Sequence, residues 1–295
     1  MRITERNRFE SPKRHLDALR QQMADASAEV STGLRVRKPS DDPMAARRVQ
    51  DLDQRIARLE AHQRAAERAD GRLRSTDGVL DEIVALMDKA KVLGLEGAND
   101  SINDQDAALI AEELTSLIAQ IQDLANTKDS DGYLFAGALG DTAPVDDALA
   151  VRTDDRALMV EASEGIRVPT GLLAAEVFGD GTPATTQVFD TLVAMRDAVA
   201  ARDQAGLDTA LGAMDDATEQ IIEARGTAGV HLGRVTGALS ILDRLSANLP
   251  IERAEVVEAD LVEAINALSR AESMFEASLA ATGRTVGGQT LLDYL

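Results

Sequence analysis

The sequence has 295 residues, enough for two or three domains of ordinary size, and 44% of them are hydrophobic. Only 2% are aromatic, with no Trp and no Cys, so any core is built mainly from Ala, Leu, Val and Ile, as in helical bundles. The lack of Cys excludes disulfides, thiolate metal sites and cysteine nucleophiles. The three His residues, His15, His62 and His231, are far apart in the sequence, so we expect no metal or catalytic cluster and no cofactor.

The charge is unevenly distributed along the chain. The formal net charge is −20, yet residues 1–75 hold 17 Lys and Arg against 12 Asp and Glu. An acidic body repels phosphate, and the basic first quarter mixes both signs, so we expect no nucleic-acid partner. The sequence contains no run of 18 apolar residues and lacks an apolar h-region near the N-terminus. We therefore expect a soluble protein without a membrane partner or a Sec-type signal.

Heptad spacing predicts a first helix over residues 13–32, and a break follows it. The apolar positions that recur at intervals of three and four are Leu16, Leu19, Met23, Ala26 and Val30. Gly33 suits the left-handed conformation that ends a helix, and Pro39 cannot lie within one. Asp42 before Pro43 is typical of a helix start, with an N-cap acceptor followed by proline at the first helical position.

Three further helices are predicted from the same spacing. One runs from Pro43 to about Leu95, and it is interrupted by the polar residues Gln63, Asp70 and Asp77. The others cover residues 107–124 and 207–249. Helices of this length need partners along their whole length, so we expect them to bury one another.

Residues 132–185 are punctuated by Gly, Pro, Thr and Asp, which predicts a small β-rich insert. A last helix is expected after Pro250, weakened near its end by Gly287 and Gly288. The fold class is therefore mainly α, with long heptad helices and a β-rich insert at the tip. The expected domains are a terminal layer (1–40 plus 255–295), a long-helix bundle (41–131 plus 186–254) and the insert (132–185).

Each candidate chemical site has a plainer structural interpretation. Asp41 and Asp42 are adjacent carboxylates, but acidic residues before proline usually cap a helix. The segment 129–132 resembles the start of a calcium loop, although Gly140 stands where the loop needs Glu, so a polar turn is favoured. Gly226 and Gly229 lie within a heptad helix, where close packing is expected rather than a phosphate site. We therefore expect no enzyme.

The two terminal segments are amphipathic and make too narrow a pair to be stable alone in water. They are therefore candidate association surfaces.

Three stretches resemble the flagellin family and span most of the chain in that family's order. They are STGLRVRKPSDDP, which ends in the Ser40-Asp41-Asp42-Pro43 motif, ANTKDSDGYLFAG at 125–137, and the C-terminal segment ADLVEAINALSRAESMFEASLAATGRTVGGQTLLDYL. Pro39, Pro43 and the Leu-Asp-Tyr-Leu ending favour the subunit at the hook–filament junction over a filament flagellin.

The resemblance implies that the terminal helices pair as an inner layer that folds on assembly. The residues that would form the N-terminal seam, the apolar stripe of the first segment, are Ile3, Phe9, Leu16, Leu19, Met23 and Val30. Those that would form the C-terminal seam, the stripe of the last segment, are Leu261, Leu268, Phe275, Leu279, Leu292 and Leu295. It further implies a homo-oligomeric ring that contacts a neighbouring hook-associated protein and flagellin. Unfolded export through the flagellar type III apparatus, a chaperone on the C-terminal seam and an extracellular location are also implied. The alternative from another class is a cytosolic coiled-coil scaffold or signalling module, which would use the same heptads in a stable dimer.

Overall fold

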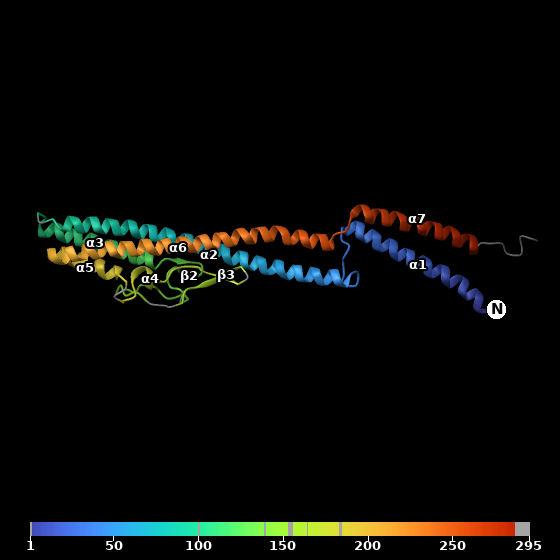
Figure 1. The fold of residues 1–295 in the computed structure, drawn as a ribbon, viewed down its shortest axis with the longest axis horizontal. Coiled ribbons are helices and arrows are strands. Elements are labelled where there is room, and N and C mark those ends of the chain that lie inside the picture. The colour runs from blue at the N-terminus through green and yellow to red at the C-terminus, as the bar shows by residue number, and fades with distance from the viewer. Residues whose placement is uncertain are drawn as a thin grey trace, which may run out of the picture. The chain divides into compact units, whose positions relative to one another are not determined.

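The computed structural model describes residues 2–99, 101–138, 140–152, 156–163, 165–182 and 185–286. Contacts divide the chain into two compact units. Unit 1 comprises Met1–Ala57 and Ser246–Leu295, and unit 2 comprises Arg58–Leu245. The fold is mainly α, as predicted, with seven helices and two small antiparallel strand pairs in the described residues (Figure 1).

Unit 1 is built on α1 (Arg2–Thr32) and α7 (Leu261–Val286), which pack against each other. It also holds the start of α2 (Pro43–Gly97) and the end of α6 (Gln204–Val257). The predicted break at Pro250 is wrong, because α6 continues through this proline to Val257. Ion pairs from Glu252 to Arg48 and from Arg253 to Asp53 tie this last part of α6 to α2.

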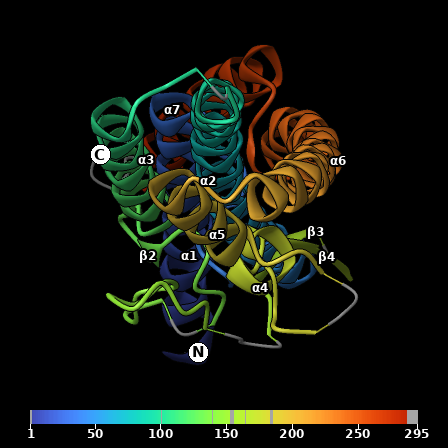
Figure 2. The ribbon, with the colours of Figure 1, turned by 90° about the vertical axis from the view of Figure 1, so that its left-hand side faces the viewer.

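Unit 2 is a bundle in which α2, α3 (Asp104–Ala125), α5 (Val188–Ala201) and α6 lie side by side (Figure 2). The helix α5 is not among the predicted elements, although its residues fall within the predicted long-helix domain. The bundle core is apolar and free of bulky rings on α2, α3 and α6. It includes Leu80, Ile83, Met87, Leu114, Leu117, Ile121, Met214, Ala217 and Ile221, which are almost fully buried.

The polar residues that interrupt the predicted apolar stripe of α2 face polar partners on α6. Gln63 Nε2 donates to Asp243 Oδ1 at 3.1 Å, and Thr236 Oγ1 donates to Asp70 Oδ1 at 3.4 Å. Arg225 Nε donates to Asp77 Oδ1 at 2.9 Å. These interhelical contacts fix the register of the two helices, because a slide of one turn would separate every pair.

The insert contains the strand pairs β1 (Lys128–Asp129) with β2 (Gly132–Tyr133) and β3 (Met159–Ser163) with β4 (Ile166–Pro169), and the short helix α4 (Ala174–Phe178). It was predicted at the tip, but its contacts with Arg72 and His62 place it alongside the middle of α2. The reason is that the 22 residues of α3 lead the chain back along α2 before the insert begins.

An aromatic cluster joins the insert to the bundle. The Phe135 and Phe178 rings meet edge to face with centroids 5.5 Å apart, and Phe189 on α5 lies 5.5 Å from Phe178. Three of the five Phe residues of the chain therefore close the junction between insert and helices. None of the helices in the described part of the chain combines the length and apolarity that a bilayer crossing needs.

Candidate assembly surface on the terminal helices and their linkers

The terminal helices α1 and α7 meet through a thin apolar contact. On α1, Leu19 and Ala26 are buried, whereas the seam residues Leu16, Met23 and Val30 are half-buried. On α7, Ala264 and Ala271 are buried, and the seam residues Leu268 and Phe275 are half-buried. The guanidinium of Arg20 lies 5.4 Å above the Phe275 ring, which adds a cation–π contact between the helices.

Two further members of the predicted C-terminal seam are exposed. Leu261 is 50% exposed and Leu279 is 45% exposed. The side chains of Ile3 and Phe9, together with Leu292 and Leu295, lie outside the described residues.

A second apolar surface of α7 escaped the sequence analysis. Val262 and Ile265 are 70% and 54% exposed, and together with Leu261 they form a patch at the start of the helix. Further along, Met274 is also exposed. Val262, Ile265 and Met274 lie beside the predicted C-terminal seam rather than on it, so a search for a single apolar stripe does not find them. An uncovered apolar patch of this kind is typical of a surface that meets another protein.

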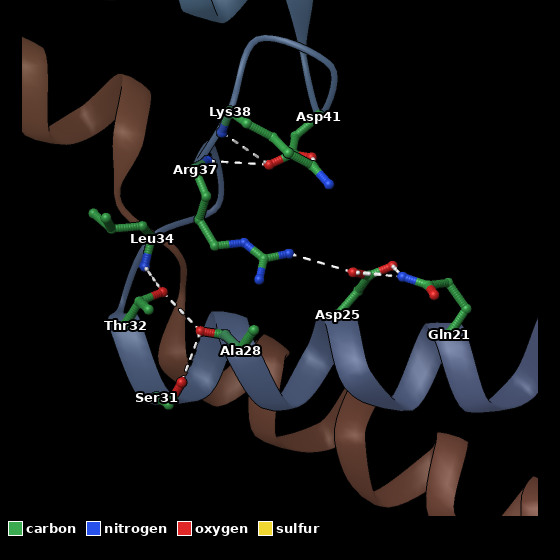
Figure 3. A network of polar contacts seen from close by, with 9 residues as sticks. All are labelled: Gln21, Asp25, Ala28, Ser31, Thr32, Leu34, Arg37, Lys38 and Asp41. Atoms are coloured by element: carbon green, nitrogen blue, oxygen red, sulfur yellow. Dashed lines mark hydrogen bonds and ion pairs between the residues drawn. The ribbon is translucent and has the colours of Figure 1, made fainter.

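The linker that follows α1 begins with a compact helix end. Gly33 adopts φ 68°, and its N–H donates to Glu29 O at 2.8 Å, as expected of a left-handed C-cap. Thr32 Oγ1 donates to Ala28 O at 2.7 Å and accepts the N–H of Leu34 (Figure 3). The hydroxyl thus binds both the last turn of the helix and the first residues of the linker.

Asp41 organises the turn that follows. Its Oδ2 accepts the backbone N–H groups of Arg37 at 3.2 Å and Lys38 at 3.1 Å (Figure 3). Arg37 in turn reaches back to Asp25 on α1, with Nη2 3.4 Å from Oδ1. The turn is thereby attached to the side of α1. Ser40, in the middle of the family-like motif, is exposed.

Asp42 caps α2, as its position before Pro43 predicts. Its Oδ1 accepts the N–H groups of Met44 at 3.1 Å and Ala45 at 3.0 Å. The hydrogen bond from Ala45 and the nearby Arg35 guanidinium lower the pKa of this carboxyl below its ordinary value of 3.8. Asp41 and Asp42 are both occupied by backbone hydrogen bonds, which supports the capping interpretation over a catalytic acid pair.

The two linkers of unit 1, residues 33–42 and 258–260, are hydrogen-bonded to each other. Arg35 N donates to Val257 O at 2.8 Å, and Ala259 N donates to Gly33 O at 2.9 Å. The Arg35 guanidinium joins Asp42 Oδ2 at 3.2 Å to Val256 O at 3.1 Å. One arginine therefore connects the first residue before α2 with the last turn of α6.

The start of α7 has its own cap. Asp260 Oδ1 accepts the N–H groups of Val262 at 2.9 Å and Glu263 at 3.2 Å. The cap sets the helix start at Leu261, so that the exposed patch begins on the first turn.

The candidate chemical sites of the sequence have structural roles or none in the described residues. No group of three or more His, Asp or Glu side chains among them is placed to bind a metal ion. Asp129, at the start of the calcium-like segment, pairs with Arg72 at 2.7 Å. Gly226 and Gly229 do not mediate close packing, contrary to expectation, because a Cβ at either position meets nothing within 4 Å.

Comparison with known proteins links this architecture to bacterial flagella. The family model described as the bacterial flagellin N-terminal helical region matches residues 10–139. Flagellar hook-associated protein 3 of Escherichia coli is 26% identical over 86% of this chain and 87% of its own length. The protein of the same name from Salmonella typhimurium is 23% identical over 94% of this chain and 95% of its own length. Bacillus subtilis flagellin is 22% identical over 85% of each chain.

Two solved structures share the fold. A flagellar hook-associated protein from Vibrio parahaemolyticus matches 74% of this chain and all of its own, with a TM-score of 0.67 and 22% identity. FlgL from Xanthomonas campestris matches 69% of this chain and 99% of its own, with a TM-score of 0.62 and 18% identity. The long-helix bundle with its small strand pairs is therefore an architecture that these proteins have in common.

Proposed function

We propose that this chain is a member of the flagellin family and a structural subunit of the bacterial flagellum, the adaptor at the junction between hook and filament. The observation that carries the proposal is the similarity to two proteins named flagellar hook-associated protein 3, which covers 86% and 94% of this chain. The family is one of structural proteins, which supports a structural role.

The exposed patch of α7 supports an assembling subunit. The α1–α7 pair buries few side chains of its own, whereas Leu261, Val262 and Ile265 stay open to solvent. Apolar burial stabilises by about 25 cal/mol per Å², so covering this patch by neighbouring subunits favours assembly. In this proposal, residues 1–40 and 255–295 form the assembly layer, with the N-terminal and C-terminal seams as its contact residues.

The same reasoning extends to partners and location. We infer a homo-oligomeric ring between a hook-side protein and flagellin, outside the cell. The C-terminal seam and the neighbouring patch would need cover before assembly, which is the chemistry that an export chaperone supplies. Type III export suits a chain without Cys, since it forms no disulfides that export would have to break.

A filament flagellin is the alternative within the family. It is favoured by the similarity to flagellins, including that of Halalkalibacterium halodurans, 22% identical over 86% of this chain and 85% of its own length. Pro39 in the linker before α2, Pro43 at the first position of α2 and the Leu-Asp-Tyr-Leu ending favour the junction protein.

Deletion of the gene tests the proposal. We expect cells that keep hooks, lose filaments and release flagellin monomers into the medium, with motility restored by the wild-type gene. Filaments that persist with altered shape or length would instead identify a minor flagellin. Unchanged flagella and motility would overturn both interpretations.

A further inference from the structure

The hairpin β3–β4 of the insert contacts the bundle beside two of the three His residues of the chain. His62 Nδ1 on α2 lies 3.0 Å from Glu161 O on β3. His231 on α6 lines an open cavity of about 470 Å³, together with Pro169 at the end of β4 and Leu172 just after it. Each long helix therefore places one imidazole beneath the hairpin, one near its turn and one at its base.

The two imidazoles differ in how they can accommodate a proton. A carbonyl only accepts hydrogen bonds, so His62 Nδ1 donates to Glu161 O, and this donor persists when the ring is charged. His231 Nδ1 is buried and has no hydrogen-bond partner within the described part of the chain. A neutral ring can leave this nitrogen without a proton, whereas a charged ring carries an N–H on both nitrogens. Protonation of His231 in place would thus bury a charged donor that nothing accepts, which costs free energy.

Charged groups of α4 and α6 surround His231 without offsetting this cost. Burial lowers the pKa of His231 below its ordinary value of 6.5, the nearby Arg234 lowers it further, and Glu176 on α4 opposes the shift. Glu176 Oε2 already accepts the backbone N–H of Leu173 at 3.1 Å. Glu223, about two turns before His231 on α6, lines the same cavity. The residues that the hairpin and its flanks contribute to the lining are uncharged, namely Ala157, Pro169, Gly171 and Leu172.

The charges of α2 opposite His231 are paired with one another or with other elements. This stretch of α2 runs from Asp70 to Asp77, because these two residues contact α6 on either side of His231. Its cations, Arg72 and Arg74, each have a carboxylate partner. Asp70 and Asp77 each pair with an arginine in turn. Among the described residues, α2 therefore provides no unpaired carboxylate at this level to receive a charged His231.

The rest of the insert has anchors that do not involve His231. Phe135 and Phe178 pack with Phe189 of α5, and Arg72 binds Asp129 in β1. These contacts lie outside the hairpin β3–β4. The hairpin can therefore leave α6 while the remainder of the insert stays attached to the bundle.

We propose that His231 is a pH-sensitive latch, which holds the hairpin β3–β4 on α6 while its side chain is neutral and releases the hairpin when its side chain is protonated. The released ring takes up a proton near pH 6.5, and the docked ring takes one up only at a lower pH. Docking is therefore complete above pH 6.5 and weakens as the pH falls below it. The latch lies within unit 2 and does not rest on the junction role.

The absence of Cys allows two dyes to be attached at chosen positions of the full-length chain. Arg167→Cys on β4 and Ser240→Cys on α6 are exposed positions, and single-molecule energy transfer between dyes on them measures the fraction of chains with a released hairpin. We expect this fraction to rise at least about threefold from about pH 7.5 to about pH 5.0, a window above the ordinary carboxyl pKa values. The pair Asp131→Cys and Ser240→Cys is the control, because the turn between β1 and β2 is held by Arg72, and should change little. A fraction that is the same at both pH values would overturn the proposal.

Two variants assign the response to one histidine. His231→Leu carries no titratable group and should keep the hairpin docked at both pH values. His62→Gln retains a donor for Glu161 O and should leave the response unchanged. A response that persists in His231→Leu, or that is lost in His62→Gln, would overturn the assignment to His231. Histidine NMR titration of the wild-type chain tests the latch without a substitution, since a His231 ring that titrates at or above 6.5 would contradict it.

Discussion

Arg72 is the only charged side chain that is buried among the described residues, and it connects the insert to α2. Its Nη1 lies 2.7 Å from Asp129 Oδ2, and its Nη2 donates to the carbonyls of Tyr133 and Leu134. A buried cation costs free energy unless it is paired. Here one carboxylate and two carbonyls bind the two terminal nitrogens of the guanidinium, while its buried Nε has no hydrogen-bond partner. The arginine thus holds the whole turn between β1 and β2 against the middle of the long helix.

We predict that Arg72→Met lowers the free energy of unfolding by about 3 kcal/mol, because it leaves Asp129 and two carbonyls without their donor. Urea denaturation followed by circular dichroism measures the loss. Arg74→Met, which breaks an exposed pair with Asp70 on the same helix, is the control and should have a far smaller effect. Equal effects of the two variants would mean that the buried pair does not hold the insert.

The cap at Asp42 predicts a pH dependence at the linker. Its pKa is lowered in the folded chain, so its contribution to stability is complete above the ordinary value of 3.8 and is lost as the pH falls through the lower folded value. Carboxyl NMR titration should find this pKa below 3.8, and Arg35→Ala should raise it by removing one stabilising cation. An unchanged pKa in Arg35→Ala would show that the backbone hydrogen bonds alone set it.

At the scale of elements, local signals in the sequence account for the helix starts and the apolar faces. Asp42 and Pro43 mark the start of α2, and the 3- and 4-residue spacing places Leu73, Leu80 and Met87 in its core, where they are fully buried. What the sequence could not reveal are pairings between distant residues. The ion-pair partners of Asp77 and Asp129 depend on where α6 and the insert pack against α2. A heptad pattern carries no information about that packing.

Pro250 shows the same limit in the opposite sense. Proline in a helix interior costs about 3 kcal/mol, which makes a break the sound local expectation. Here α6 persists for seven further residues, up to Val257, and two of these residues form ion pairs with α2. Contacts along the partner helix thus outweigh a local preference. The exposed apolar patch of α7 was missed for a related reason. A search for a single apolar stripe on each helix assigns no role to apolar residues that lie beside the stripe.

Two glycines of similar appearance should respond oppositely to substitution. A Cβ at Gly97 would lie 2.7 Å from Val199 Cγ2, on a stiff and buried side chain, so Gly97→Ala should destabilise unit 2 by about 1–3 kcal/mol. A Cβ at Gly226, inside α6, meets nothing within 4 Å, so Gly226→Ala should stabilise by about 0.5–1 kcal/mol through helix propensity. Thermal and urea unfolding measure both. The same sign for the two variants would contradict the packing described for Gly97.

At the scale of the whole molecule, the two units differ in how their helices are supported. In unit 2, four helices and the insert share one core that includes fully buried Leu, Ile, Met and Phe side chains. In unit 1, the described part of α1 buries only Leu19 and Ala26, and α7 buries only Ala264 and Ala271. Burial of two side chains per helix cannot offset the ordering of about 25–30 residues, so the terminal pair depends on additional cover.

This difference predicts how a protease attacks the purified monomer. Trypsin should cleave first at sites in the terminal segments, such as Arg14, Arg20 and Arg270, and leave a stable core that contains Arg58–Leu245. Arg58 and Arg68 are matched internal controls, because they are equally exposed on a helix but belong to unit 2. Intact-mass measurement over time identifies the order of cleavage. Cleavage at Arg68 as early as at Arg20 would contradict the difference in stability between the units. Terminal segments that resist as long as the core would show that α1 and α7 are stable without neighbours, and a self-contained coiled-coil scaffold would then explain the chain better than an assembling adaptor.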